Sequence, residues 1–130
     1  MAVFQRILVP TDFSDSSASA ADLAAELARQ VGCEVQLVTV VDTRPLMEAY
    51  GDESFRYERM EAIRAGARTQ IEELADRRFA GCKVTSEVRD GDPASEILAA
   101  AAACGADLIV MGTHARDGLA HRLVGSVAEK

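Results

Sequence analysis

Apolar residues in the first third of the chain follow the pattern of a strand, a helix and a second strand. Residues 7–9 form a short apolar run closed by Pro10, and beyond Ser14, which can cap a helix, apolar residues recur at helical spacing. The recurring positions are Ala20, Leu23, Ala24, Leu27 and Val31. Gly32 ends this helix, and residues 35–41 form a β-branched run with little alternation, as in a parallel strand covered on both faces. The pattern predicts a right-handed βαβ unit.

The middle of the chain begins with a stretch that has no hydrophobic period. Residues 42–56 contain Pro45, Gly51 and several charges, which predicts a long surface loop. A second helix is then indicated by an apolar face, whose members are Met60, Ile63, Ala67, Ile71 and Leu74. In residues 84–89 apolar and polar positions alternate, which is typical of a strand at a sheet edge.

The last third predicts one more helix and one more strand. Asp92 as N-cap and Pro93 at the first helical position open a helix that Gly105 stops. Residues 108–111 form a continuous apolar strand, followed by a glycine-punctuated loop to residues 125–126, where we predict that a last helix begins. Four strands that alternate with helices predict an α/β fold, with a doubly wound parallel sheet and helices on both faces.

Composition and charge narrow the class of protein. The 130 residues and 48% apolar content suffice for one domain, which we assign to residues 1–130. The net charge of −7 argues against nucleic acid or an anionic membrane surface as a partner. No signal segment or membrane-spanning run is recognised, so we expect a cytoplasmic protein. The three cysteines are widely spaced and read as buried apolar residues in a reducing compartment.

Ligands of doubly wound sheets bind beyond the carboxyl ends of the strands, near the point where strand order reverses. The candidate lining is therefore Asp12, residues 40–42, residues 89–91 and the segment from Met111 onward. Gly112 leaves a buried strand and residues 125–126 lie where the last helix is predicted to open, so backbone amides from both could converge on an anion. Ser126 could cap that helix and also donate its hydroxyl to phosphate.

The chain resembles the universal stress protein family in three segments, which are residues 9–14 (VPTDFS), 91–93 (GDP) and 107–114 (DLIVMGTH). The resemblance extends over essentially the whole chain. The resemblance implies a Rossmann-like sheet of the adenine nucleotide alpha hydrolase type and an ATP site, with magnesium accompanying the nucleotide. Nucleotide-binding members carry a G-x2-G-x9-G-S/T signature, and this chain has Gly112, Ala115 and Gly125-Ser126 at that spacing.

The resemblance also implies residue roles. Asp12 and the backbone of Val40 would contact adenine or ribose, and the phosphate loop would supply the remaining contacts. The implied cofactor-binding residues are Asp12, Val40, Met111, Gly112, Ala115, Gly125, Ser126 and Val127. Family members form dimers through a final strand that lies beyond the position of residue 130, so we expect a four-stranded sheet without that strand and a homodimer paired through an exposed edge.

Several residues admit two interpretations. Asp12 could accept from a ligand or only favour the positive end of a helix dipole, and Ala115 puts a methyl group where the signature has glycine. His114 and Arg116 could face phosphate, although exposed loop residues are the favoured interpretation. His121 has no carboxylate or cysteine partner at ligand spacing, so we expect no protein metal site.

Three functions follow, in order of preference. The first is a stress-response module that binds an adenine nucleotide and signals through dimerisation or a partner. The second is a nucleotide-independent interaction module with a degenerate phosphate loop. The third is an ATP-using enzyme such as an adenylating ligase or nucleotidyltransferase. It is ranked last because it would need a catalytic base, lysine or metal carboxylates near the loop, where the sequence offers only Asp12 and Arg116.

Overall fold

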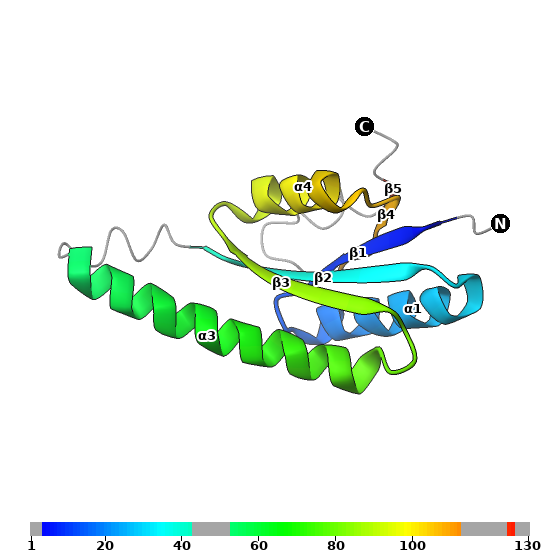
Figure 1. Ribbon diagram of the computed structural model, residues 1–130, viewed down its shortest axis with the longest axis horizontal. Helices are drawn as coiled ribbons and strands as arrows, with labels where there is room; N and C mark the ends of the chain where they lie inside the picture. The colour runs from blue at the N-terminus through cyan, green and yellow to red at the C-terminus, as the bar shows by residue number, and fades with distance from the viewer. Residues whose placement is uncertain (1–3, 43–52, 113–124, 127–130) are drawn as a thin grey trace.

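The computed structural model describes residues 4–42, 53–112 and 125–126 (Figure 1). Strands and helices alternate along the chain. They are β1 (Arg6–Pro10), α1 (Asp15–Val31), β2 (Glu34–Val41), α3 (Glu53–Arg78), β3 (Val84–Asp90), α4 (Pro93–Cys104), β4 (Leu108–Ile109) and β5 (Gly125–Ser126). No helix in these three ranges combines the length and the apolar character that crossing a bilayer requires.

The strands form one sheet in the order β3-β2-β1-β4-β5. β1 pairs in parallel with β2 on one side and with β4 on the other, and β2 pairs in parallel with β3. This arrangement confirms the predicted doubly wound sheet. Strand order reverses at β1, so the switch point lies between the carboxyl ends of β1 and β4. β3 lies at an edge of the sheet, as its alternating sequence predicted.

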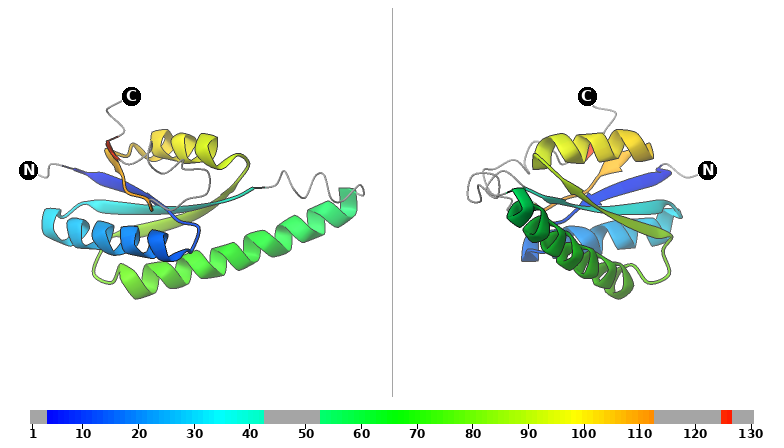
Figure 2. Two further views of the ribbon diagram at one scale, coloured as in Figure 1. Left: turned by 180° about the vertical axis from the view of Figure 1, so that it is seen from behind. Right: turned by 60° about the vertical axis from the view of Figure 1, so that its left-hand side comes forward.

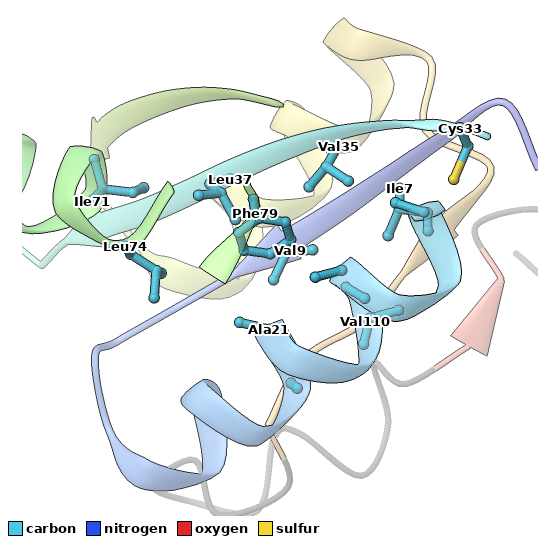
Figure 3. Close-up of a cluster of buried hydrophobic side chains, with 14 residues drawn as sticks. Ile7, Val9, Ala21, Cys33, Val35, Leu37, Ile71, Leu74, Phe79 and Val110 are labelled. Atoms are coloured by element: carbon cyan, nitrogen blue, oxygen red, sulfur yellow. The ribbon is translucent and has the colours of Figure 1, made fainter. Parts of the chain in front are cut away.

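Helices cover both faces of the sheet, with α1 and α3 on one face and α4 on the other (Figure 2). Successive residues of β1 point to opposite faces, so Ile7 and Val9 join the core beneath α1 and α3, whereas Leu8 joins the core beneath α4. Figure 3 shows the larger core, in which Phe79 lies among side chains from both central strands. This two-sided burial explains the unbroken apolar run of residues 7–9 in β1 and the weak alternation of β2.

Helix ends follow the predicted signals closely. The Ser14 side chain accepts a hydrogen bond from the Ser17 amide at the start of α1, and Gly32 closes that helix with φ of 80°. Asp92 caps α4 in the same way and Pro93 occupies its first turn. Gly105 ends α4 with φ of 68°, a conformation that costs glycine little.

One predicted loop is partly wrong. Residues 42–56 were expected to lack structure, but α3 begins at Glu53, so the end of that stretch is helical. α3 is 26 residues long, and its amino-terminal half extends past the sheet in Figure 1. Residues 53–56 have no apolar period of their own, which is why the pattern missed the start of this helix.

The end of the chain is also corrected. Residues 125–126 were predicted to open a helix, but they form β5, which pairs antiparallel with β4. The sheet therefore has five strands rather than the expected four. β4 spans Leu108–Ile109 only, although the Val110 amide still donates to Leu8 at 3.0 Å. The two residues of β5 are too short a pattern to distinguish a strand from the start of a helix. Their strand conformation comes from pairing with the backbone of β4, which lies far away in the sequence.

Candidate functional site

The carboxyl ends of β1 and β4 bring two predicted site residues to the switch point. Asp12 follows β1 by two residues, and Gly112 follows β4 by three. Asp12 lies beside the first turn of α1 because the short β1–α1 connection starts that helix at Asp15. Gly112 lies beside the same turn because it packs against Ser16 and Ser17. The turn, the helix start and Gly112 are the centre of the candidate site.

Side chains of the turn hold it in shape through its own backbone amides. The Phe13 amide donates to Thr11 Oγ1 at 3.0 Å, and the Ser14 amide donates to Asp12 Oδ1 at 3.0 Å. These bonds accompany a φ of 66° at Phe13, a left-handed conformation that is uncommon in residues other than glycine. The strained backbone is therefore fixed by side-chain oxygens on both sides of it.

Asp12 is exposed, yet its carboxylate is tethered. Ser17 Oγ donates to Asp12 Oδ1 at 2.6 Å, in addition to the bond from the Ser14 amide. Partial burial acts to raise the pKa of Asp12, but hydrogen bonds from Ser14 and Ser17 outweigh it and hold that pKa below its ordinary value. Asp12 is therefore ionised at neutral pH and can only accept hydrogen bonds. Asp12 therefore lies at the positive end of α1 and its carboxylate can accept a hydrogen bond, while its contact with a ligand stays a prediction.

Gly112 is buried against the start of α1. A Cβ at this position would lie 2.7 Å from Ser16 Oγ, and 2.9 Å from both the Ser16 carbonyl carbon and the Ser17 amide nitrogen. Two of these three atoms are backbone and cannot rotate away. Glycine is thus required here by close approach, and that approach ties the exit of β4 to the turn that carries Asp12.

Val40 and Met111 lie on the face of the sheet that α4 covers. Both are partly buried and pack against the cluster that contains Leu8, Val38 and Ile109. They come from β2 and the exit of β4, the strands on either side of β1. This side of the candidate site is therefore an apolar wall formed by Val40 and Met111.

The arginines near the end of β3 are already paired with carboxylates. Arg89 Nε donates to Glu96 at 2.9 Å and Arg89 Nη1 donates to Glu87 at 3.2 Å. Arg64 of α3 donates to Asp90 at 2.9 Å. Hydrogen bonds to these carboxylates raise the pKa of both arginines. The charged side chains of residues 89 and 90, predicted to line the site, are therefore held in ion pairs with neighbouring residues.

The remaining predicted site residues are placed only in part. Gly125 and Ser126 lie in β5, beside β4. Ala115 and Val127 fall outside the described residues, as do His114, Arg116 and His121. In the part of the chain that the structure describes, no three His, Cys, Asp or Glu side chains gather as metal ligands. Of the cysteines, Cys33 is buried as predicted, whereas Cys82 and Cys104 are only partly buried.

Ser16 and Ser17 belong to the site but were interpreted from the sequence only as capping residues. Ser14 does cap α1, whereas Ser17 holds Asp12 and Ser16 contacts Gly112. Spacing carried a signal for Ser17, since a residue five positions after Asp12 and in the first helical turn lies over the preceding loop. No local signal links Ser16 to Gly112, which is 96 positions away.

Comparison with known proteins agrees with this geometry. The protein-family model described as "Universal stress protein family" matches residues 4–130. Universal stress protein MJ0531 of Methanocaldococcus jannaschii is 36% identical over 98% of this chain and 75% of its own length. The solved structure of MJ0577 from the same organism has a TM-score of 0.78 at 30% identity, covering 98% of this chain and 88% of that one.

A further solved structure is that of a universal stress protein in complex with cAMP. It has a TM-score of 0.67 at 26% identity and covers 97% of this chain and 86% of its own. A nucleotide is thus bound by one protein of similar fold. With a family match across nearly its entire length and the switch-point geometry described above, this chain belongs to the universal stress protein family.

Proposed function

We propose that this protein is an adenine nucleotide-binding module of the stress response. The observation that carries the proposal is the meeting of Asp12 and Gly112 on the first turn of α1, at the switch point of a doubly wound sheet. Asp12 offers an ionised acceptor to a ribose hydroxyl or a base amine. The apolar wall of Val40 and Met111 suits an aromatic base on the α4 side.

The charges of the turn indicate how a nucleotide would lie. Asp12 and Asp15 place two carboxylates at the start of α1, where they already complement the helix dipole. Phosphates are repelled from that helix end and would bind towards the exit of β4. Gly112, Ala115, Gly125, Ser126 and Val127 are the proposed phosphate and ribose contacts there, with magnesium bound to the nucleotide rather than to a protein metal site.

The competing function is a nucleotide-independent interaction module of the same fold. Ala115 favours it, because a methyl group replaces the middle glycine of the family's phosphate signature. Both functions describe a binding module with no catalytic residue. They differ in whether ATP stabilises the folded protein.

Thermal unfolding with and without ATP and magnesium tests the proposal. Ligand at about 100 times its dissociation constant adds roughly 2.7 kcal/mol to the free energy of unfolding, which raises the melting temperature measurably. Asp12→Asn should reduce this rise. Glu26→Gln, an exposed change of the same type elsewhere on α1, should leave it unaltered. An unchanged melting temperature at millimolar ATP would favour the interaction module.

We also propose that the protein acts in the cytoplasm as a homodimer. β3 forms one edge of the sheet and β5 covers β4 over two residues, which leaves backbone groups that a second copy can pair. The net charge of −7 disfavours nucleic acid and anionic membranes as partners. Light scattering over a range of concentrations checks the dimer, and a monomer throughout would contradict it.

A further inference from the structure

Ser17 is a buried hydroxyl group in the first turn of α1, with 6% of its surface exposed. It takes part in three hydrogen bonds through its oxygen. Ser17 Oγ donates to Asp12 Oδ1 at 2.6 Å, accepts from Ser14 Oγ at 3.2 Å and accepts from the Asp12 amide at 3.3 Å. The shortest of the three is the bond to the carboxylate of Asp12, the proposed ligand-binding group.

Capping of α1 does not need this hydroxyl. Ser14 is the N-cap, and its oxygen accepts from the Ser17 amide, while the Ser14 carbonyl accepts from the Ala18 amide at 2.9 Å. The first turn of the helix is thus satisfied by Ser14 and by backbone atoms. The Ser17 hydroxyl instead donates a hydrogen bond to the carboxylate of Asp12.

This bond decides which oxygen of Asp12 is left for a ligand. Oδ1 accepts from the Ser14 amide at 3.0 Å and from Ser17 Oγ at 2.6 Å, which makes Oδ2 the oxygen more available to a ligand. A carboxylate held by two donors on one oxygen cannot rotate without losing a short, charge-assisted bond. Gly112 packs on the Ser16–Ser17 backbone and keeps Ser17 in place.

We propose that Ser17 is a positioning residue that aims Asp12 Oδ2 at a hydrogen-bond donor of the bound nucleotide. The inference rests on the proposed nucleotide site and adds to it the origin of ligand selectivity. A ligand with an amine or hydroxyl at this point gains a charge-assisted bond. A ligand with a carbonyl, or with no polar group there, loses it.

Calorimetric titration with three nucleotides tests this inference. ATP is compared with inosine triphosphate, which carries a carbonyl in place of the base amine, and with 2′-deoxy-ATP, which lacks one ribose hydroxyl. In the unaltered protein we expect one of the two analogues to bind on the order of tenfold more weakly than ATP. In Ser17→Ala that ratio should fall towards one, as it should in Asp12→Asn.

Two further variants separate positioning from structural support. Ile71→Val trims a buried side chain of α3 in the core, away from the Asp12 turn, so it should lower stability and keep the ratio. Ser17→Thr retains the hydroxyl and should restore the ratio. Without ligand, carbon NMR titration of the Asp12 carboxyl should give a higher pKa in Ser17→Ala, because one of its stabilising hydrogen bonds is lost.

Each outcome decides a specific point. An equal loss of affinity for all three nucleotides in Ser17→Ala would make Ser17 merely structural and overturn the inference while the nucleotide site stands. Equal affinity of the unaltered protein for all three would show that Asp12 meets no donor, which also overturns it. Failure of the unaltered protein to bind any of them would refute the proposed function itself.

Discussion

Replacement of Gly112 by alanine tests the contact that joins β4 to the start of α1. The added Cβ would lie 2.9 Å from the Ser16 carbonyl carbon and from the Ser17 amide nitrogen, distances that real Cβ atoms essentially never show. It would also lie 2.7 Å from Ser16 Oγ. The hydroxyl can rotate aside, but the two backbone atoms belong to a helical turn and must shift with it.

The expected cost follows from that geometry. Overpacking of a tight site costs about 1–3 kcal/mol, and we expect the upper part of this range because the helix backbone must move. For a domain of this size, that corresponds to a fall in melting temperature on the order of 10 °C. Ser16→Ala in the Gly112→Ala background removes only the hydroxyl contact, so it should recover less than half of the loss.

Urea unfolding of the variants measures the effect against a matched control. Gly66 lies within α3, exposed and with nothing within 4 Å of an added Cβ. Gly66→Ala should therefore stabilise the protein by about 0.8–1 kcal/mol through helix propensity. Opposite signs for the two substitutions are the predicted result. A Gly112→Ala variant within about 0.5 kcal/mol of the unaltered protein would refute the close approach.

Three other predictions concern the pH response, the core and the phosphate loop. The folded-state pKa of Asp12 lies below the ordinary value of 3.8, so its contribution to stability is present at neutral pH and lost as the pH falls through that folded-state value. Asp12→Asn should flatten acid denaturation below about pH 5 by less than about 1 kcal/mol, because the group is partly exposed; urea titrations at several pH values check this. Phe79→Ala should lower the free energy of unfolding by about 3–5 kcal/mol, since Phe79 is 1% exposed, and a loss below about 1 kcal/mol in urea would contradict its place in the core. Ala115→Gly should tighten ATP binding on the order of tenfold by calorimetry if that position requires a positive φ, and equal affinity would show that Ala115 does not limit the site.

The sequence predicted what local rules determine. Ser14, Gly32, Asp92 and Gly105 mark helix ends through capping chemistry that acts within a few residues, and all four lie where the pattern put them. Apolar runs predicted β1, β2 and β4, because burial on both faces leaves little alternation, whereas alternation predicted β3 at the edge. At residues 53–56 the sequence has no apolar period, so the first turn of α3 was predicted as loop and the prediction failed there.

Only those parts of the candidate site that follow from the order of strands along the chain could be predicted. Asp12 and Gly112 follow strands, so the rule for doubly wound sheets placed both at the switch point. The contact between Gly112 and the Ser16–Ser17 backbone joins distant parts of the chain and depends on how α1 packs against β1 and β4. Such a contact is a property of packed elements, and no pattern within either segment contains it.

That packing gives the proposed site two halves with different physical origins. The Asp12 half is built on the rigid β1–α1 turn, where Thr11, Ser14 and Ser17 fix a strained backbone and an ionised carboxylate. In the proposed phosphate half, the contacts would come from backbone amides around Gly112 and from the segment that contains Ala115. Gly112 follows β4 and packs against the start of α1, so a substitution there should disturb both halves. Ser17→Ala should act on the Asp12 half alone, and Ala115→Gly on the phosphate half alone. Nucleotide selectivity and phosphate affinity should therefore respond separately to these two substitutions, because each acts on a different half of the proposed site.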